Sequence, residues 1–141
     1  MCALRRFESP HERGVSTILV GSDALKAAAP EISAWCQGRR VFLITSEQVG
    51  SLFEDAVRTL LGSSAAVETL IVPDGEEAKS VAVADGLWNE MLERGGKRDS
   101  RVIALGGGSV GDVAGFVAAC FLRGVELAQI PTTLLAQVDA S

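Results

Sequence analysis

The sequence predicts an α/β protein with a mostly parallel sheet and helices on both of its faces. Two observations lead to this prediction. From residue 16 onward, short β-branched runs alternate with longer segments of helical periodicity, and repeated strand–helix units of this length favour parallel pairing. The composition is globular, with 48 % hydrophobic and 22 % charged residues. The 141 residues match one domain in size and contain no linker or internal repeat.

Five segments are predicted as strands. They consist mainly of aliphatic residues, and the second is largely apolar, as a parallel strand covered on both faces should be. In chain order the predicted strands are residues 16–21, 40–46, 67–72, 101–105 and 125–130.

A helical segment follows each of the first three strands. Between residues 22 and 36, Pro30 is expected to end one short helix or to open the next. Residues 47–62 are amphipathic, and residues 79–96 end at a glycine pair, which is a common helix stop. The Trp and Met side chains of the third helix have helical spacing, and we assign them to the core.

A fourth helix is predicted over residues 110–123. Asp112 lies in its first turn, Arg123 lies in its last turn, and Gly124 follows directly. Another helical segment begins after Pro131.

Composition and charge narrow the function classes. The net charge of −5, the absence of Tyr and an aromatic content of 5 % argue against a nucleic-acid partner, which needs a basic face and stacking side chains. The three cysteines are widely spaced, and we expect Cys36 and Cys120 to be small buried hydrophobic residues in a reducing compartment. The polar start does not resemble a signal peptide, and no apolar run is long enough to span a membrane, so we expect a cytoplasmic protein.

The main functional signal is the glycine turn GGGSVG at residues 106–111. Glycines let a phosphate approach the backbone, and the helix that follows offers free N–H groups and a positive dipole end. In open α/β sheets, ligands bind beyond the carboxyl ends of the strands. We therefore predict that the backbone of residues 106–112 binds phosphate or pyrophosphate.

Two features set this turn apart from the dinucleotide-binding fingerprint. The turn follows the fourth strand instead of the first, and Glu126 opens the next strand instead of closing it. The alternative interpretation is a helix–strand packing turn in which Asp112 only complements the helix dipole.

Two blocks of sequence resemble a known family. Residues 104–139, ALGGGSVGDVAGFVAACFLRGVELAQIPTTLLAQVD, closely resemble the core of the 3-dehydroquinate synthase family, and residues 72–80, VPDGEEAKS, resemble its DGExxKS segment. The related glycerol-dehydrogenase-like alcohol dehydrogenases read GGGSxxDxAK at the same place. Gly115 stands here where their Lys would be, and Gly111 precedes Asp112, which favours the synthase.

The resemblance implies a Rossmann-like fold and an NAD- and metal-dependent carbon–oxygen lyase of the shikimate pathway of aromatic amino acid biosynthesis. Such an enzyme converts 3-deoxy-D-arabino-heptulosonate 7-phosphate to 3-dehydroquinate and phosphate by transient oxidation, phosphate elimination, reduction and aldol cyclisation. The family also implies a zinc or cobalt ion and a homodimer.

The resemblance also implies cofactor-binding residues in three segments. The residues that match the family's NAD-binding segments are Asp74, Gly75, Glu76, Lys79, Gly107, Gly108, Ser109, Val110, Gly111, Asp112, Thr132 and Thr133. The alternative interpretation of residues 74–79 is a solvated turn that caps the third helix. The alternative interpretation of Thr132 and Thr133 is a local helix cap that follows an X-Pro bond. The family often places Asp or Asn for the adenosine ribose where Ser46 stands here.

Two further matches concern the substrate. Asp139 matches an acid near cofactor and substrate, and Arg123 matches an arginine that reaches substrate phosphate across a dimer interface. Their alternatives are a solvated helix acid and a cation at a helix C-terminus. No catalytic residue is assigned.

The ending suggests a truncated chain, because a helical pattern stops at Ser141 without a cap. The family's C-terminal helical domain carries its metal ligands, and His11 is the single histidine here, so we assign no metal ligand and expect this chain alone to be inactive. The alternatives are another sugar-phosphate cyclase, a glycerol-dehydrogenase-like polyol dehydrogenase, or a non-catalytic nucleotide-binding module.

Overall fold

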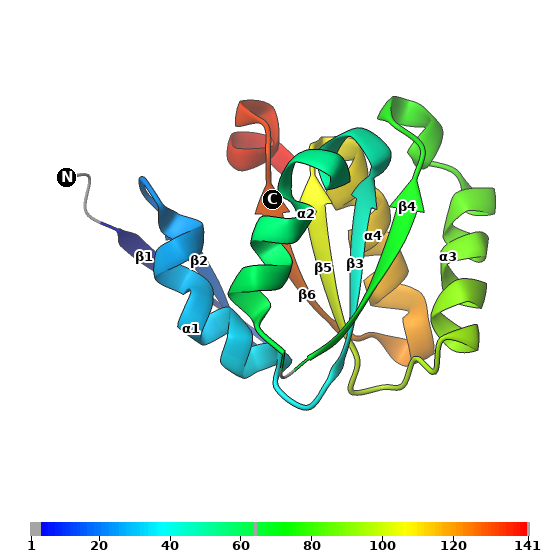
Figure 1. The fold of residues 1–141 in the computed structure, drawn as a ribbon, viewed down its shortest axis with the longest axis horizontal. Helices are drawn as coiled ribbons and strands as arrows, with labels where there is room; N and C mark the ends of the chain where they lie inside the picture. Colours follow the sequence, from blue (N-terminus) through cyan, green and yellow to red (C-terminus); the bar gives the residue numbers. More distant parts are fainter. Residues whose placement is uncertain (1–3, 64, 141) are drawn as a thin grey trace.

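The structure is a computed structural model that describes residues 4–63 and 65–140. Its centre is a four-stranded parallel sheet with the strand order β4-β3-β5-β6 (Figure 1). The strands are β3 (Arg40–Ser46), β4 (Ala66–Val72), β5 (Arg101–Gly106) and β6 (Glu126–Pro131). The predicted α/β class with a mostly parallel sheet is confirmed.

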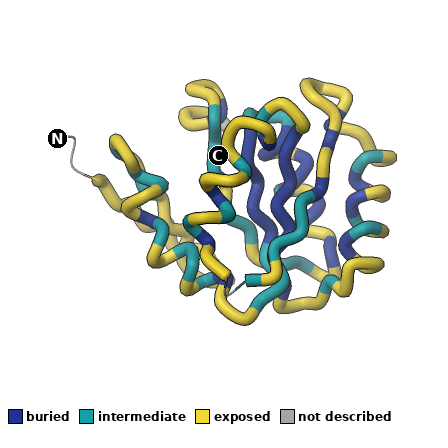
Figure 2. Tube along the Cα trace, in the orientation of Figure 1, coloured by how far each residue is buried: buried dark blue, intermediate teal, exposed yellow. Residues whose placement is uncertain are grey.

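Helices cover both faces of this sheet, as predicted. The helices are α1 (Ala24–Cys36), α2 (Glu47–Leu61), α3 (Val81–Glu93) and α4 (Gly108–Cys120). Alternate residues of the central strands separate the two layers: Phe42 and Ile44 pack with α3 and α4, whereas Val41 and Leu43 pack with α1 and α2. Figure 2 shows β3 and β5 as the most deeply buried strands of the sheet.

The prediction for the first strand is wrong in its pairing. Residues 16–21 were expected to join the parallel sheet, but β2 (Gly14–Val20) pairs antiparallel with β1 (Arg5–His11) in a separate two-stranded hairpin. The polar sequence RRFESPH of β1 has no strand-like alternation of its own, so only its pairing with β2 makes it a strand.

Pro30 neither ends nor opens a helix. It lies inside the continuous helix α1, and both halves of this helix pack against the core cluster beneath it, by Leu25 on one side of Pro30 and by Ile32 and Trp35 on the other. Packing at both ends keeps the helix continuous although Pro30 cannot donate its helical hydrogen bond.

The limits of the fourth helix also differ from the prediction. The helix α4 begins at Gly108, so Asp112 lies beyond its first turn, and it ends at Cys120. Arg123 belongs to a separate 3-10 turn, η2 (Phe121–Arg123), that follows the helix. Phe121 leaves the helix to pack into the core, where it is 3 % exposed.

Cysteine burial is predicted correctly for Cys36 and wrongly for Cys120, which is exposed. Within residues 4–63 and 65–140, no helix combines the length and hydropathy needed to cross a membrane.

Candidate nucleotide-binding site

The candidate site lies at the edge of the sheet where all four parallel strands end, at the top of Figure 1. The chain leaves β3 towards β4 on one side and leaves β5 towards β6 on the other, so the strand order reverses between β3 and β5. A reversal of this kind opens a crevice between the two strand ends, which is where ligands of open α/β sheets bind.

The start of α4 faces this crevice without a side-chain cap. Its N-cap residue is Gly107, whose carbonyl accepts the first helical hydrogen bond from the N–H of Gly111. In contrast, Ser46 caps α2 and Ser80 caps α3 through their hydroxyl groups. The first amides of α4 therefore have neither a helical partner nor a cap, which suits them to an anion.

The glycines of the turn have different physical roles. A Cβ on Gly106 would lie 2.7 Å from the Cβ of Val110, so the packing of α4 on its own strand already requires glycine there. A Cβ on Gly107 would lie 3.4 Å from Cγ2 of Thr133, a tight contact that is not prohibitive. Helix–strand packing, the alternative interpretation of this turn, thus explains Gly106. It does not explain Gly107, where the lack of a side chain would let a ligand approach the backbone closely.

The segment at residues 74–79 docks against this helix start, although it lies about thirty residues earlier in the chain. It forms η1 (Gly75–Ala78), a 3-10 turn between β4 and α3. The hydroxyl of Ser109 donates to Oε1 of Glu76 at 3.3 Å, which ties the turn to the first residues of α4. Gly75 has a φ of 71°, a conformation that favours glycine.

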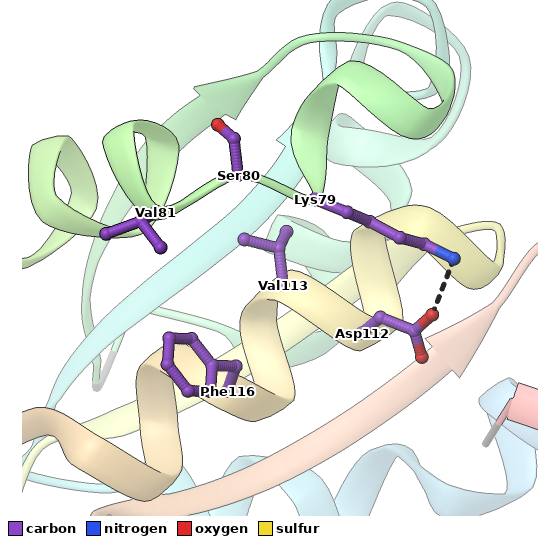
Figure 3. Close-up of a pocket in the computed structure, with 6 residues that line it drawn as sticks. All are labelled: Lys79, Ser80, Val81, Asp112, Val113 and Phe116. Atoms are coloured by element: carbon purple, nitrogen blue, oxygen red, sulfur yellow. Dashed lines mark ion pairs between the residues drawn. The ribbon is translucent and has the colours of Figure 1, made fainter.

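Lys79 provides the second link. Its Nζ lies 2.9 Å from Oδ2 of Asp112, as Figure 3 shows. The same Nζ lies 3.2 Å from Oε1 of Glu76. The hydrogen bond with Asp112, followed by that with Glu76, raises the pKa of Lys79. The ammonium group is therefore charged at neutral pH and is held between the two predicted cofactor-binding segments.

A hollow of about 220 Å³ opens beside this ion pair. It is lined by Lys79, Ser80, Val81, Asp112, Val113 and Phe116. Charged groups form one end of the hollow and apolar side chains form the other, as the close-up in Figure 3 shows.

The threonine pair completes the set at the end of β6. The N–H of Thr132 donates to the carbonyl of Gly106 at 2.9 Å, which extends the pairing of β5 and β6 by one residue. The hydroxyl of Thr133 accepts from the N–H of Ala136 at 3.1 Å, so the predicted capping role of this residue is confirmed. Its methyl group lies beside Gly107.

The structure separates the two substrate candidates. Asp139 lies in η3 (Ala136–Ala140), a π-helical turn at the same edge of the sheet, and its side chain is exposed. Arg123 follows the far end of α4, a helix of 13 residues and therefore about 20 Å long, so it does not reach the glycine turn of its own chain.

Ser46 is 1 % exposed and uses its hydroxyl to cap α2, where it accepts from the N–H of Val49 at 3.4 Å. Ser109, predicted only as a cofactor-binding residue, also holds Glu76 through its hydroxyl group. A serine directly after the glycines is the signal that could have indicated it. Among residues 4–63 and 65–140, no three His, Cys, Asp or Glu side chains gather in a way that could hold a metal ion.

Comparison with known proteins gives the family. The family model described as 3-dehydroquinate synthase N-terminal matches residues 69–141, just over half of the chain. The chain belongs to the 3-dehydroquinate synthase family. A 3-dehydroquinate synthase of Shewanella loihica is 40 % identical over 124 residues, which cover 88 % of this chain and 34 % of that protein. One of Shewanella denitrificans is 42 % identical over 124 residues, with the same coverage.

This member of the 3-dehydroquinate synthase family thus spans about a third of the length of these relatives. Solved structures of sugar-phosphate cyclases share its fold. A 2-deoxy-scyllo-inosose synthase complexed with carbaglucose-6-phosphate, NAD+ and Co2+ matches 96 % of this chain and 36 % of its own, with a TM-score of 0.84 and 25 % identity.

A 2-epi-5-epi-valiolone synthase from Streptomyces hygroscopicus, with NAD+ and Zn2+ bound, matches 80 % of this chain and 32 % of its own. Its TM-score is 0.69 and its identity is 28 %. The Rossmann-like fold predicted for this family is therefore confirmed.

Proposed function

We propose that this chain is the nucleotide-binding part of a 3-dehydroquinate synthase and that it binds NAD at the carboxyl edge of its sheet. The observation that carries the proposal is the uncapped start of α4, against which residues 74–79 and Thr133 converge. The titles of two solved relatives name NAD+ together with Co2+ or Zn2+, which supports the same cofactor for this chain.

Each group at the site has a part in this proposal. The amides at the start of α4 and the positive end of its dipole bind the pyrophosphate, and Gly107 lets the phosphate reach the backbone. The ammonium of Lys79 adds positive charge beside it. Glu76 and Asp112 orient this ammonium, and their carboxylates are available to accept hydrogen bonds from ribose hydroxyls.

The reaction is the conversion of 3-deoxy-D-arabino-heptulosonate 7-phosphate to 3-dehydroquinate and phosphate. Bound NAD would accept a hydride from the carbon of a ring hydroxyl, the resulting ketone would acidify the neighbouring C–H for phosphate elimination, and the reduced cofactor would later return the hydride. In this proposal Asp139, exposed at the same edge of the sheet, lies near the substrate, and Arg123, beyond the far end of α4, serves the site of a second subunit. We place the zinc or cobalt ion on residues outside this chain and expect the chain alone to release no phosphate.

The second candidate is another sugar-phosphate cyclase, which the two solved relatives favour. The two 3-dehydroquinate synthases from Shewanella are 40–42 % identical to this chain. The two solved cyclases are 25–28 % identical to it. The higher identity supports the synthase over the other cyclases.

The proposal is tested by titrating the chain with NAD in a calorimeter. Lys79→Ala removes the cation at the site, and Lys97→Ala is the matched control, since Lys97 is an exposed lysine just before β5, at the opposite edge of the sheet. We expect saturable NAD binding that weakens about tenfold with Lys79→Ala, which corresponds to one lost charge-assisted contact. Absence of saturable binding, or equal weakening by both variants, would contradict the proposal.

Turnover distinguishes the two candidates. A protein that carries this segment together with a metal-binding domain should release phosphate from 3-deoxy-D-arabino-heptulosonate 7-phosphate. Release from glucose 6-phosphate analogues alone would favour a different cyclase.

A further inference from the structure

A second hollow lies at the edge of the sheet where the parallel strands begin, opposite the glycine turn. Its volume is about 370 Å³, which is larger than the hollow beside Lys79 and within the range of small-molecule sites. Three segments meet around it at the bottom of Figure 1: the turn from α1 to β3, the start of β4 and the loop from α3 to β5. The strands β3 and β5 are 7 and 6 residues long, so this edge lies about 20 Å from the candidate nucleotide site.

Positive charge is concentrated around this hollow although the chain is acidic overall. Residues 39–40 and 94–101 contain six of the 13 Lys and Arg residues and a single carboxylate, whereas the whole chain has a net charge of −5. The hollow itself is lined by three of these cations, Arg39, Arg40 and Lys97, together with Asp99. Three cations and one carboxylate leave the lining with a net charge of +2. A concave surface of one sign attracts small ions of the opposite sign.

The one carboxylate of the lining is already used by Arg39. Nη1 of Arg39 donates to Oδ2 of Asp99 at 2.6 Å. This hydrogen bond lowers the pKa of Asp99, and the charge of the nearby Lys97 acts in the same direction. Asp99 is therefore ionised at neutral pH and compensates one cation, so the charges of Arg40 and Lys97 remain in excess.

Arg40 and Lys97 also have unused hydrogen-bond donors. Nη1 of Arg40 has an acceptor in Oε1 of Glu68, at 3.5 Å, and the other carboxylate oxygen of Glu68 accepts from Arg94 at 3.2 Å. Within the described part of the chain, the other two guanidinium nitrogens of Arg40 and Nζ of Lys97 have no acceptor. Phosphate oxygens accept readily from guanidinium and ammonium groups.

Ser100 adds a buried hydroxyl group to the lining of the hollow. This residue is 1 % exposed, and its Oγ accepts from the N–H of Lys97 at 2.9 Å. The N–H of Ser100 donates back to the carbonyl of Lys97 at 3.0 Å, so the two bonds fix the backbone of Lys97 beside the hollow. The hydroxyl hydrogen of Ser100 has no acceptor among the residues that the structure describes. Because buried polar groups are normally paired, this donor points to an acceptor that enters the hollow.

We propose that this hollow binds a small phosphate-bearing anion, whose oxygens accept from Arg40, Lys97 and Ser100. Two cations in excess match the charge of a phosphate group, which is close to −2 at neutral pH, better than the single charge of a carboxylate. The volume leaves room for a small organic body, so a phosphate ester and free phosphate share the chemistry that the site recognises. The site lies on the opposite edge of the sheet from the proposed NAD site and does not depend on it.

Backbone amide NMR of the isotope-labelled chain, titrated with inorganic phosphate at constant ionic strength, tests the proposal. We expect saturable shifts of the amides of residues 94–101. Lys97→Ala should weaken this binding about tenfold, which corresponds to one lost charge-assisted contact. Arg98→Ala is the matched control, because Arg98 is an exposed cation of the same loop that does not line the hollow. The control should weaken binding by no more than about twofold, since exposed charges are screened by salt.

Three results of this titration would overturn the proposal: no saturable shift at residues 94–101, shifts confined to the glycine turn, or equal weakening by Lys97→Ala and Arg98→Ala. Arg40→Gln gives an independent variant, because Glu68 keeps Arg94 as its partner when Arg40 is replaced. We expect Arg40→Gln to weaken phosphate binding as well. Unchanged affinity of this variant would also contradict the proposed site.

Glycerol 3-phosphate and glycerol identify the source of the phosphate group. Tighter binding of the ester than of inorganic phosphate supports a phosphorylated metabolite as the ligand, and equal affinity supports free phosphate. Equal shifts with glycerol alone would overturn recognition of phosphate. Lys97→Ala should keep its affinity for NAD, so a failure of this proposal and a failure of the proposed NAD site give different results.

Discussion

At the scale of single residues, neighbouring glycines of one motif are required for different physical reasons. Gly106 is required by the contact with Val110 inside the protein, whereas Gly107 borders the open site and Thr133. The sequence pattern GGG does not distinguish these roles, because Gly106 and Gly107 both indicate only an unrestricted backbone. The space that a side chain would find at each position separates them.

A pair of alanine substitutions tests this distinction. Gly106→Ala places a methyl group 2.7 Å from Val110, so we expect it to lower the free energy of unfolding by about 1–3 kcal/mol, as overpacking does. Gly107→Ala should cost less stability and should weaken NAD binding instead. Urea unfolding and NAD titration of both variants measure the two effects. Equal stability losses would contradict the assignment.

The thiol of Cys36 makes stability depend on alkaline pH. Burial raises the pKa of this thiol to about 11, and the nearby Arg101 opposes the shift only in part. In the unfolded chain the thiol ionises near its ordinary value of 9.0. The folded state therefore keeps a proton that the unfolded state loses, so this contribution is complete below about pH 9 and is lost as the pH rises towards about 11.

We expect the free energy of unfolding to fall by about 1.5 kcal/mol between about pH 9 and pH 10.5 through this thiol. Urea unfolding at several pH values measures the slope. The sequence has no Tyr, so no phenol titrates in the same range. Cys36→Ala is the control and should show a shallower slope; an unchanged slope would exclude the thiol as its source.

At the scale of elements, the helix starts divide into capped and uncapped ones. Hydroxyl groups of Ser46 and Ser80 satisfy amides at the starts of α2 and α3, and these helices follow β3 and the turn η1. The start of α4 has glycine in the same position. A cap stabilises the fold, and its omission at one of these three helices leaves amides available for an anion.

The cap of α3 provides a test at this scale. Ser80 Oγ accepts from the N–H of Val83 at 3.2 Å, so we expect Ser80→Ala to lower the free energy of unfolding by about 1 kcal/mol. Ser51→Ala is the control, because Ser51 is an exposed serine within α2 where alanine is the better helix former. Urea unfolding compares the two; a larger loss for Ser51→Ala would contradict the capping role.

Element limits show how far local sequence patterns reach. Pro30 predicts a helix boundary because proline lacks an N–H, but packing of Leu25 and Trp35 against the core cluster holds both halves of α1 in one helix. The local pattern continues α4 as far as Arg123, but burial of Phe121 ends the helix at Cys120. In both places a tertiary contact outweighs a local preference.

At the scale of the whole molecule, the protein consists of a well-packed α/β body and a thinly attached hairpin. Two core clusters fill the two faces of the parallel sheet. The hairpin contacts this body mainly through α1, where Arg6 of β1 forms an ion pair with Glu31. A two-stranded ribbon is marginal in water unless it packs against more structure, so the hairpin depends on its contact with α1 for stability.

The sequence alone was enough for the α/β class, the four parallel strands and the segments that meet at the candidate site. Hydrophobic periodicity and glycine position are local properties, and the carboxyl ends of parallel strands necessarily share one edge. Tertiary structure alone decided that β1 is a strand, that α4 starts at Gly108, and that Lys79 is held by Asp112 across the site. These outcomes depend on contacts between residues far apart in the chain, and their free energies do not appear in any local pattern.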